Sequence, residues 1–127
     1  MHLVDSSAWI EYLQGSPRAD LFADAIENFR CLVVPTIALY EVHKILSRTV
    51  PPALVAQSLN VMRRGRVLDL TDARAIAASG VANQFKPAMA DAAMYSMAQE
   101  YGATLWTQDA NHQGLPGVQY WAKAASS

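Results

Sequence analysis

Short apolar runs alternate along the chain with longer segments in which apolar side chains recur every three or four residues. Continuous apolar runs are typical of strands buried on both faces of a sheet, and the wider spacing is typical of amphipathic helices. The runs predict strands at residues 2–4, 31–34, 66–70, 104–107 and 118–121. The spacing predicts helices over residues 6–14, 18–28, 37–47, 53–63, 72–85 and 88–101.

The alternation of strands and helices predicts the fold class, an α/β domain with a short, mainly parallel sheet flanked by helices. Thr36 is placed to cap the helix 37–47, Pro87 interrupts the chain before the last helix, and Gly102 ends that helix. No internal repeat, low-complexity stretch or long linker divides the sequence. We therefore expect one domain over residues 1–122 and a frayed tail at residues 123–127.

Composition limits the class of protein. The 127 residues are 52% apolar, enough for one packed core, and their formal net charge of -1 argues against a generally basic nucleic-acid coat. Cys31 is the single cysteine, so we expect neither a disulfide framework nor a cysteine zinc cluster, and in a buried strand it would be an inert small hydrophobe. Because no long apolar run or signal-peptide pattern is visible, we expect a soluble cytoplasmic protein with no membrane contact.

Two acidic residues follow predicted strands. Asp5 comes directly after the first strand, and Asp109 comes two residues after Thr107, the end of the fourth. In parallel α/β sheets, ligands bind in the crevice at the carboxyl ends of the strands. We therefore expect both carboxyl groups to face that crevice.

Two further acidic residues lie on predicted helices. Asp91 is in the first turn of the helix 88–101, on the same side as Tyr95 and Ala98, so its carboxyl group faces the core and requires a partner. Glu41 falls at the margin of the apolar stripe of the helix 37–47, where the periodicity allows an inward or an edge orientation.

Convergence of these four carboxylates would raise their pKa values unless a cation compensates the repulsion. The available ligands are oxygens, which suit Mg²⁺ or Mn²⁺ better than zinc. Acidic clusters that hold such ions commonly carry out phosphodiester chemistry. Arg63, Arg64 and Arg66 are a candidate contact for a phosphate backbone, although they also fit a solvated helix end.

Each acidic residue also has an ordinary structural interpretation. Asp5 is suited to cap a helix, and Asp91 is suited to interact favourably with a helix dipole. Asp109 is suited to form a turn, and Glu41 to pair with Lys44 or Arg48 on a solvated helix face. The joint arrangement of the four, rather than any one of them, favours the functional interpretation.

Several short motifs, in their order along the chain, resemble the PIN-domain family. They are Leu3-Val4-Asp5-Ser6-Ser7, Pro35-Thr36 with Tyr40-Glu41-Val42, Ala90-Asp91-Ala92, and the segment from Gly102 to Asp109. The ending Gly114-Leu115-Pro116-Gly117-Val118 is similar to the VapC-type toxins of bacterial type II toxin–antitoxin systems. The resemblance covers nearly the whole chain.

The resemblance implies an endoribonuclease that depends on Mg²⁺ or Mn²⁺, cleaves RNA, is silenced by a cognate antitoxin protein and forms a homodimer. The family's four acidic positions are matched by Asp5, Glu41, Asp91 and Asp109. The resemblance implies that Asp5 and Asp91 bind metal directly and that the other two bind through water or complete a second metal site. Its supporting hydroxyl positions are matched by Ser6 or Ser7 and by Thr107.

One pair of residues departs from the family pattern. Relatives often have an acid followed by an aromatic residue where this chain has Asn111 and His112. Asn111 can offer a carbonyl oxygen but no charge, which lowers the affinity expected of a second metal site. His112 shares no ligand spacing with His2 or His43, so we expect all three to be structural or exposed, with substrate contact as an alternative for His112.

Two rival functions belong to other classes. A receiver-like phosphoacceptor also gathers acids around Mg²⁺, but it would have adjacent acids after the first strand and a lysine after a late one, where this chain has Asp5 alone and Thr107-Gln108-Asp109. A non-catalytic PIN-like module that binds RNA or a protein without cleavage is the remaining alternative. The complete set of four acids argues against it, but Asn111, at a position that is often acidic in relatives, keeps it open.

Overall fold

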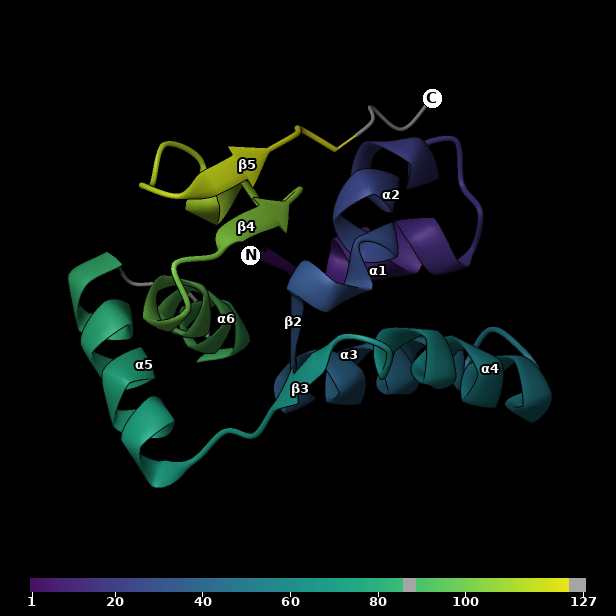
Figure 1. Cartoon of the computed structure of the whole chain (residues 1–127), viewed down its shortest axis with the longest axis horizontal. Coiled ribbons are helices and arrows are strands. Elements are labelled where there is room, and N and C mark those ends of the chain that lie inside the picture. Colours follow the sequence, from purple (N-terminus) through teal and green to yellow (C-terminus); the bar gives the residue numbers. More distant parts are fainter. Residues whose placement is uncertain (86–88, 124–127) are drawn as a thin grey trace.

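The computed structural model, which describes residues 1–85 and 89–123, contains one five-stranded sheet in which every strand pair is parallel (Figure 1). The strand order is β3-β2-β1-β4-β5. The strands are β1 His2–Val4, β2 Leu32–Pro35, β3 Arg66–Leu68, β4 Thr104–Thr107 and β5 Val118–Tyr120. The α/β fold class and the parallel sheet predicted from the sequence are therefore confirmed.

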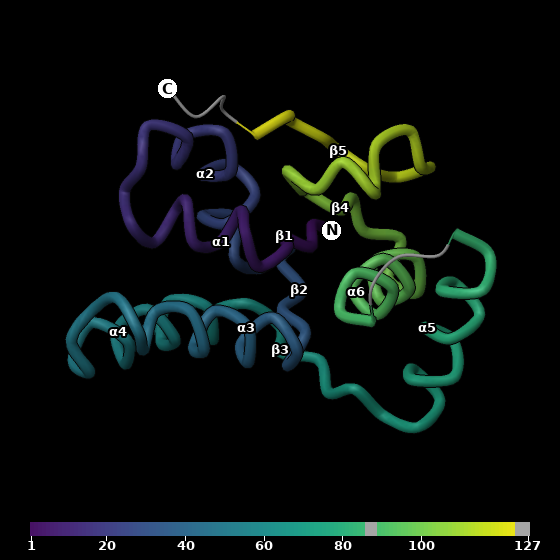
Figure 2. Tube along the Cα trace, turned by 180° about the vertical axis from the view of Figure 1, so that it is seen from behind, coloured from purple at the N-terminus to yellow at the C-terminus, as the bar shows by residue number. Residues whose placement is uncertain are grey.

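Helices connect the strands and cover both faces of the sheet. They are α1 Ser6–Leu13, α2 Ala19–Glu27, α3 Thr36–Leu46, α4 Pro52–Met62, α5 Asp72–Phe85 and α6 Met89–Glu100, with single 3₁₀ turns η1 Phe29–Cys31 and η2 Ala110–His112. α2 packs on β1, whereas α6 packs on β1, β2 and β4 and carries α5 on its outer side. The view from behind shows α1 and α2 together on one side and the α5–α6 pair on the other (Figure 2).

Apolar side chains of the three central strands form the middle of the core. Leu3, Val4 and Leu105 are fully buried, as are Val33 and Val34 of β2, which explains why these strands appear as continuous apolar runs in the sequence. The helices add large buried side chains, among them Trp9, Phe22, Met62, Met94, Tyr95 and Met97. None of the helices that the structure describes is long and apolar enough to cross a bilayer.

Several local predictions are corrected. Pro35, the last residue of β2, is the N-cap of α3, and Thr36 is its first helical residue, because the chain turns directly from strand to helix. Cys31 lies in η1 and is half-buried rather than inside a buried strand, since its amide donates to the Asn28 carbonyl in a tight turn. β3 ends at Leu68 because only three of its residues pair with β2. The break at Pro87, the helix start at residue 88 and the tail at 124–127 lie outside the described residues.

Gly65 allows β3 to approach β2 closely. A Cβ atom at this position would lie 2.8 Å from Val34 Cγ2 and 3.0 Å from the Leu32 carbonyl oxygen. Both neighbours are buried in the central part of the sheet and have little room to move. A Cβ atom added at Gly80, inside α5, would have no neighbouring atom within 4 Å, so Gly80 is a matched control.

We expect Gly65→Ala to lower the free energy of unfolding by about 1–3 kcal/mol, because the added methyl group overpacks the edge between β2 and β3. Gly80→Ala should instead be neutral or stabilise by up to about 1 kcal/mol, because alanine favours the helix. Urea unfolding of the two variants beside the wild type measures both effects. Equal stability of the Gly65→Ala variant and the wild type would contradict the tight strand approach.

Candidate metal centre

The carboxyl ends of β1 and β4 meet at one edge of the sheet, beside the two helices that carry the other acidic residues. Asp5 follows β1 and Asp109 follows β4, while Glu41 comes from the middle of α3 and Asp91 from the first turn of α6. All four side chains line a single cleft of about 660 Å³. The structure thus brings together the four acidic residues that the sequence analysis selected.

Asp5 is held by hydrogen bonds to both carboxylate oxygens. Its Oδ1 accepts from the Ala8 amide at 3.0 Å and from the Ser7 hydroxyl at 3.1 Å, and its Oδ2 accepts from the Thr107 hydroxyl. The side chain is only 4% exposed. Asp5 is therefore both the N-cap of α1 and a member of the cleft, so the two interpretations of this residue are compatible.

Thr107 joins the ends of the two central strands. Its fully buried hydroxyl donates to Asp5 and accepts the Asp109 amide at 2.8 Å. The Asp5 amide in turn donates to the Trp106 carbonyl at 3.1 Å, which continues the pairing of β1 with β4. These contacts fix the separation of Asp5 and Asp109 through backbone and side chain together.

Two further predicted residues support other parts of the cleft. The Ser6 hydroxyl donates to Glu41 Oε1 at 2.6 Å and so links α1 to α3, which settles the orientation of Glu41 toward the cleft. Asn111 is exposed, and its backbone amide, rather than its side chain, contacts the site by donating to Asp109 Oδ1 at 2.9 Å. Asp109 thereby caps the η2 turn.

The surroundings of Asp91 perturb its acidity strongly. Burial, reinforced by the neighbouring Asp109 carboxylate and by the charges of Asp5 and Glu41, raises the pKa of Asp91 to about 7. Burial also raises the pKa of Asp5, although its three hydrogen bonds oppose the shift. The pKa of Asp109 is lowered, because its hydrogen bonds with Asn111 and Asp91 outweigh the effect of its burial.

The donor set fits a hard divalent cation. The four candidate carboxyl groups share the cleft, and burial together with the neighbouring carboxylates raises the pKa of Asp91 to about 7. A bound Mg²⁺ or Mn²⁺ would offset the repulsion among these carboxylates, and carboxylate oxygens are the ligands these ions prefer. The residues present are therefore compatible with the metal that the sequence analysis anticipated.

Three further residues also belong to this region: His112, which the sequence analysis did not assign as a metal ligand, and Arg18 and Lys123, which it did not consider as site residues. His112 is buried, and its ring lies with Asp91 and Asp109 so that one possible ligand atom from each falls within 4.8 Å of the others. Arg18 and Lys123 line the cleft and supply its positive charge. The Arg18 guanidinium donates to Gln108 Oε1 and to the Ala122 carbonyl, both at 2.6 Å, so it fastens the start of α2 to the segments after β4 and β5. Neither cation stands beside an acidic motif in the sequence, and only the tertiary fold brings them here.

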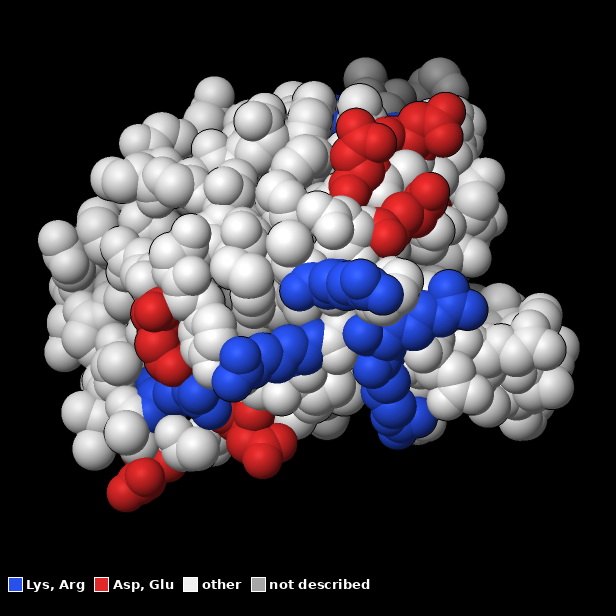
Figure 3. All heavy atoms as spheres, in the orientation of Figure 1, with Lys and Arg blue, Asp and Glu red and all other residues white. Residues whose placement is uncertain are grey.

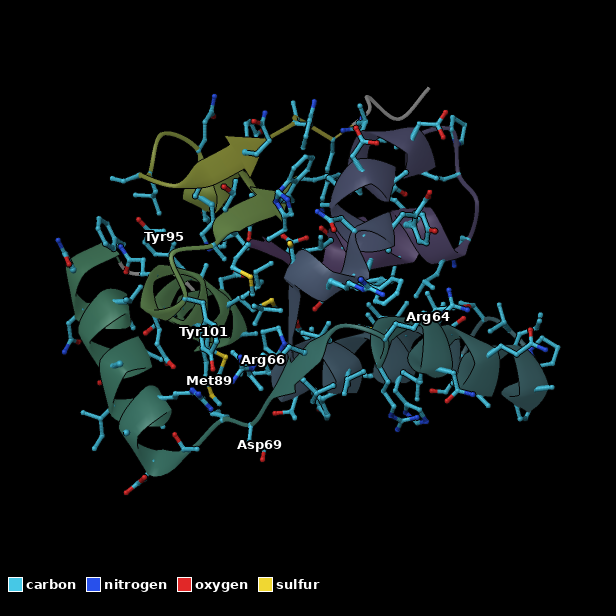
Figure 4. All side chains as sticks on the ribbon, viewed as in Figure 1. Arg64, Arg66, Asp69, Met89, Tyr95 and Tyr101 are labelled. Atoms are coloured by element: carbon cyan, nitrogen blue, oxygen red, sulfur yellow. The ribbon has the colours of Figure 1, made fainter. Side chains whose placement is uncertain are left out.

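The structure does not bring the three candidate arginines into the cleft. Arg63 and Arg64 precede β3 and Arg66 begins it, which places them at the amino edge of a parallel sheet, opposite the edge that carries the acids. Lysine and arginine side chains form a band across the face seen in Figure 3, and Figure 4 labels Arg64 and Arg66 on that face. Arg66 stacks over the Tyr101 ring at 5.3 Å, an interaction that accounts for its position without a substrate.

Comparison with known proteins identifies the protein family. A sequence model of the PIN domain matches residues 2–117. Because the match covers most of the sequence, the chain belongs to the PIN-domain family. No curated protein sequence matches it.

Solved structures share the fold at low sequence identity. A toxin–antitoxin complex from Klebsiella pneumoniae matches with a TM-score of 0.79 at 18% identity, over 94% of this chain and 96% of that chain. VapC20 of Mycobacterium tuberculosis, a sarcin–ricin loop cleaving toxin, matches with a TM-score of 0.76 at 16% identity, over 93% and 97%. VapBC2 from Rickettsia felis, bound to a promoter DNA fragment, gives 0.74 at 12% identity, over 94% and 98%. At these identities the likeness establishes the fold alone.

We expect the raised pKa of Asp91 to make the metal-free protein less stable as pH rises. An aspartate with a raised folded pKa stabilises the fold below its ordinary pKa and loses that contribution as pH rises toward about 7. In chelator, the Tm of the wild type should therefore fall between about pH 5 and pH 8 by more than the Tm of Asp91→Asn does. Differential scanning calorimetry checks this, with Asp24→Asn, an exposed change on α2, as the control. Parallel profiles of Tm against pH for the wild type and the Asp91→Asn variant would contradict the raised pKa of Asp91.

Proposed function

We propose that the protein is a divalent-metal-dependent endoribonuclease and the toxin of a toxin–antitoxin pair. The observation that carries the proposal is the convergence of Asp5, Glu41, Asp91 and Asp109 in one cleft. Membership of the PIN-domain family and the resemblance noted in the sequence support it.

In the proposed site, Asp5 and Asp91 would hold the ion directly, while Glu41 and Asp109 would hold it through water or complete a second site. Bound Mg²⁺ or Mn²⁺ would supply activation of water and stabilisation of charge on the phosphate. The hydrolysis adds a water oxygen to phosphorus and releases the 3′ oxygen of the neighbouring nucleotide.

The surrounding residues fix the geometry on which this chemistry depends. Hydrogen bonds from Ser7, Ala8 and Thr107 leave Asp5 little rotational freedom, and Ser6 holds Glu41 in the same way. Such preorganisation of ligands spares reorganisation during the reaction. Lys123, which is exposed and lines the cleft, is the free cation best placed among the described residues to contact an entering phosphate.

The proposed partners follow from the same family. A cognate antitoxin and a second copy of the chain are the expected protein partners. Three structures with this fold support the antitoxin: one is titled a toxin–antitoxin complex, one is the VapBC2 complex on promoter DNA, and one is FitAB on a DNA fragment.

Cleavage of a labelled RNA by the purified protein tests the activity. We expect cleavage with Mg²⁺ or Mn²⁺ and none in chelator, and we expect Asp5→Asn and Asp91→Asn to lower the rate at least about 100-fold without unfolding the protein. Asp24→Asn, which changes an exposed acid on α2, should keep the wild-type rate.

The same assay separates the alternatives. Near-normal cleavage by the Asp5→Asn or the Asp91→Asn variant would refute the assignment of these acids as metal ligands. RNA that binds in chelator and is not cut after either metal is added would instead favour a non-catalytic binding module. In cells, growth arrest that depends on Asp91 and is relieved by an adjacently encoded small protein would support the toxin–antitoxin assignment.

A further inference from the structure

His112 is a buried imidazole close to Asp91 and Asp109, two of the acids that line the cleft. It ends the η2 turn, is 1% exposed, and packs at 6.1 Å between ring centroids against Tyr95 of α6, a residue labelled in Figure 4. Its Nε2 lies 3.4 Å from the Asp91 carbonyl oxygen, which is long for a hydrogen bond. Its Nδ1 is buried without a hydrogen-bond partner among the described residues. A buried polar atom in this state is costly and calls for an explanation.

The position of the His112 ring beside two carboxylates offers an explanation for its unpaired nitrogen. One ligand atom each from Asp91, Asp109 and His112 lies within 4.8 Å of the others. Atoms bound to one ion at about 2.1 Å lie about 3 to 4 Å apart, so small side-chain rotations would bring the three to a common ion. Because an imidazole that binds metal generally donates its other N–H to a carbonyl or carboxylate, a ring with one nitrogen near the Asp91 carbonyl and one nitrogen free can do both.

We propose that Asp91, Asp109 and His112 form a mixed carboxylate–imidazole subsite that prefers a first-row transition-metal ion such as Mn²⁺ to Mg²⁺. The inference rests on the proposed function, since it takes the acidic cleft as the metal site, and it deepens that function by naming the class of metal. Imidazole nitrogen suits transition metals, whereas Mg²⁺ takes oxygen ligands almost entirely. Without His112 the cleft would offer oxygen ligands only and little basis for such a preference.

Nitrogen coordination can be measured independently of RNA cleavage. In pulsed electron paramagnetic resonance of the full-length protein loaded with Mn²⁺, a directly bound imidazole produces a ¹⁴N modulation. We expect this modulation in the wild type, its replacement by a ¹⁵N signal after labelling with [¹⁵N]histidine, and its loss in His112→Phe, where a ring still packs against Tyr95. The modulation should persist in His43→Gln, a change at an exposed position on α3.

Titration calorimetry measures the selectivity. His112→Phe should lose about tenfold or more in Mn²⁺ affinity, with a much smaller change for Mg²⁺. If His112→Phe fails to fold, a protein carrying both His2→Gln and His43→Gln keeps His112 as its single histidine, and its labelled form must still give the ¹⁵N signal.

Each outcome decides the proposal. Bound Mn²⁺ without nitrogen coupling, or coupling that survives His112→Phe, would overturn the imidazole subsite while leaving the metal-dependent nuclease intact. Failure of the protein to bind either ion would overturn the subsite and the metal-dependent function together.

Discussion

Mutual repulsion among carboxylates is the constraint that the rest of this site has to satisfy. Burial, together with the nearby carboxylates of Asp109, Asp5 and Glu41, raises the pKa of Asp91 to about 7. The free energy that holds these groups together comes from the buried sheet, in which β1 and β4 pair directly, and from the Thr107 hydroxyl that joins Asp5 to the Asp109 backbone. The fold therefore maintains a local arrangement that is unfavourable in the absence of a cation, which is the condition expected of a preorganised metal site.

The sequence predicts much of this arrangement because its signals are local. The runs that become β1 and β2 are buried on both faces, and β4 is buried on one face and half-buried on the other. Asp5 directly follows β1 and Asp109 comes two residues after β4, so the parallel sheet implies their common edge. The helical position of Asp91 among apolar residues likewise predicts that it faces inward, and the structure places it at the cleft. Periodicity left the orientation of Glu41 open, and its hydrogen bond from Ser6, 35 residues away in sequence, decides it.

What the sequence could not predict depends on contacts between distant segments. The strand order makes β1 and β4 neighbours, and no local pattern specifies that order. The predicted strand 66–70 of a parallel sheet already implied that Arg63, Arg64 and Arg66 lie at its amino edge, away from the acids. No local pattern, however, indicated that Arg18 reaches Gln108 across 90 residues. His112 was missed because its partners are carboxylates from α6 and from the end of β4 rather than another histidine. A signal was present in its position three residues after Asp109, within one short turn.

The distribution of charge around the cleft links metal binding to substrate binding. Five carboxylates line the cleft, from Asp5, Glu11, Glu41, Asp91 and Asp109, against the two cations of Arg18 and Lys123. Arg18 is already engaged by Glu11 at 3.4 Å and by Gln108, which leaves it little capacity to neutralise a phosphate. A phosphate group would therefore meet a negative surface in the metal-free protein, and a bound divalent ion would offset most of that charge. Under the function proposed above, the metal would serve substrate binding as well as chemistry, because it would neutralise the same acids that otherwise repel a phosphate.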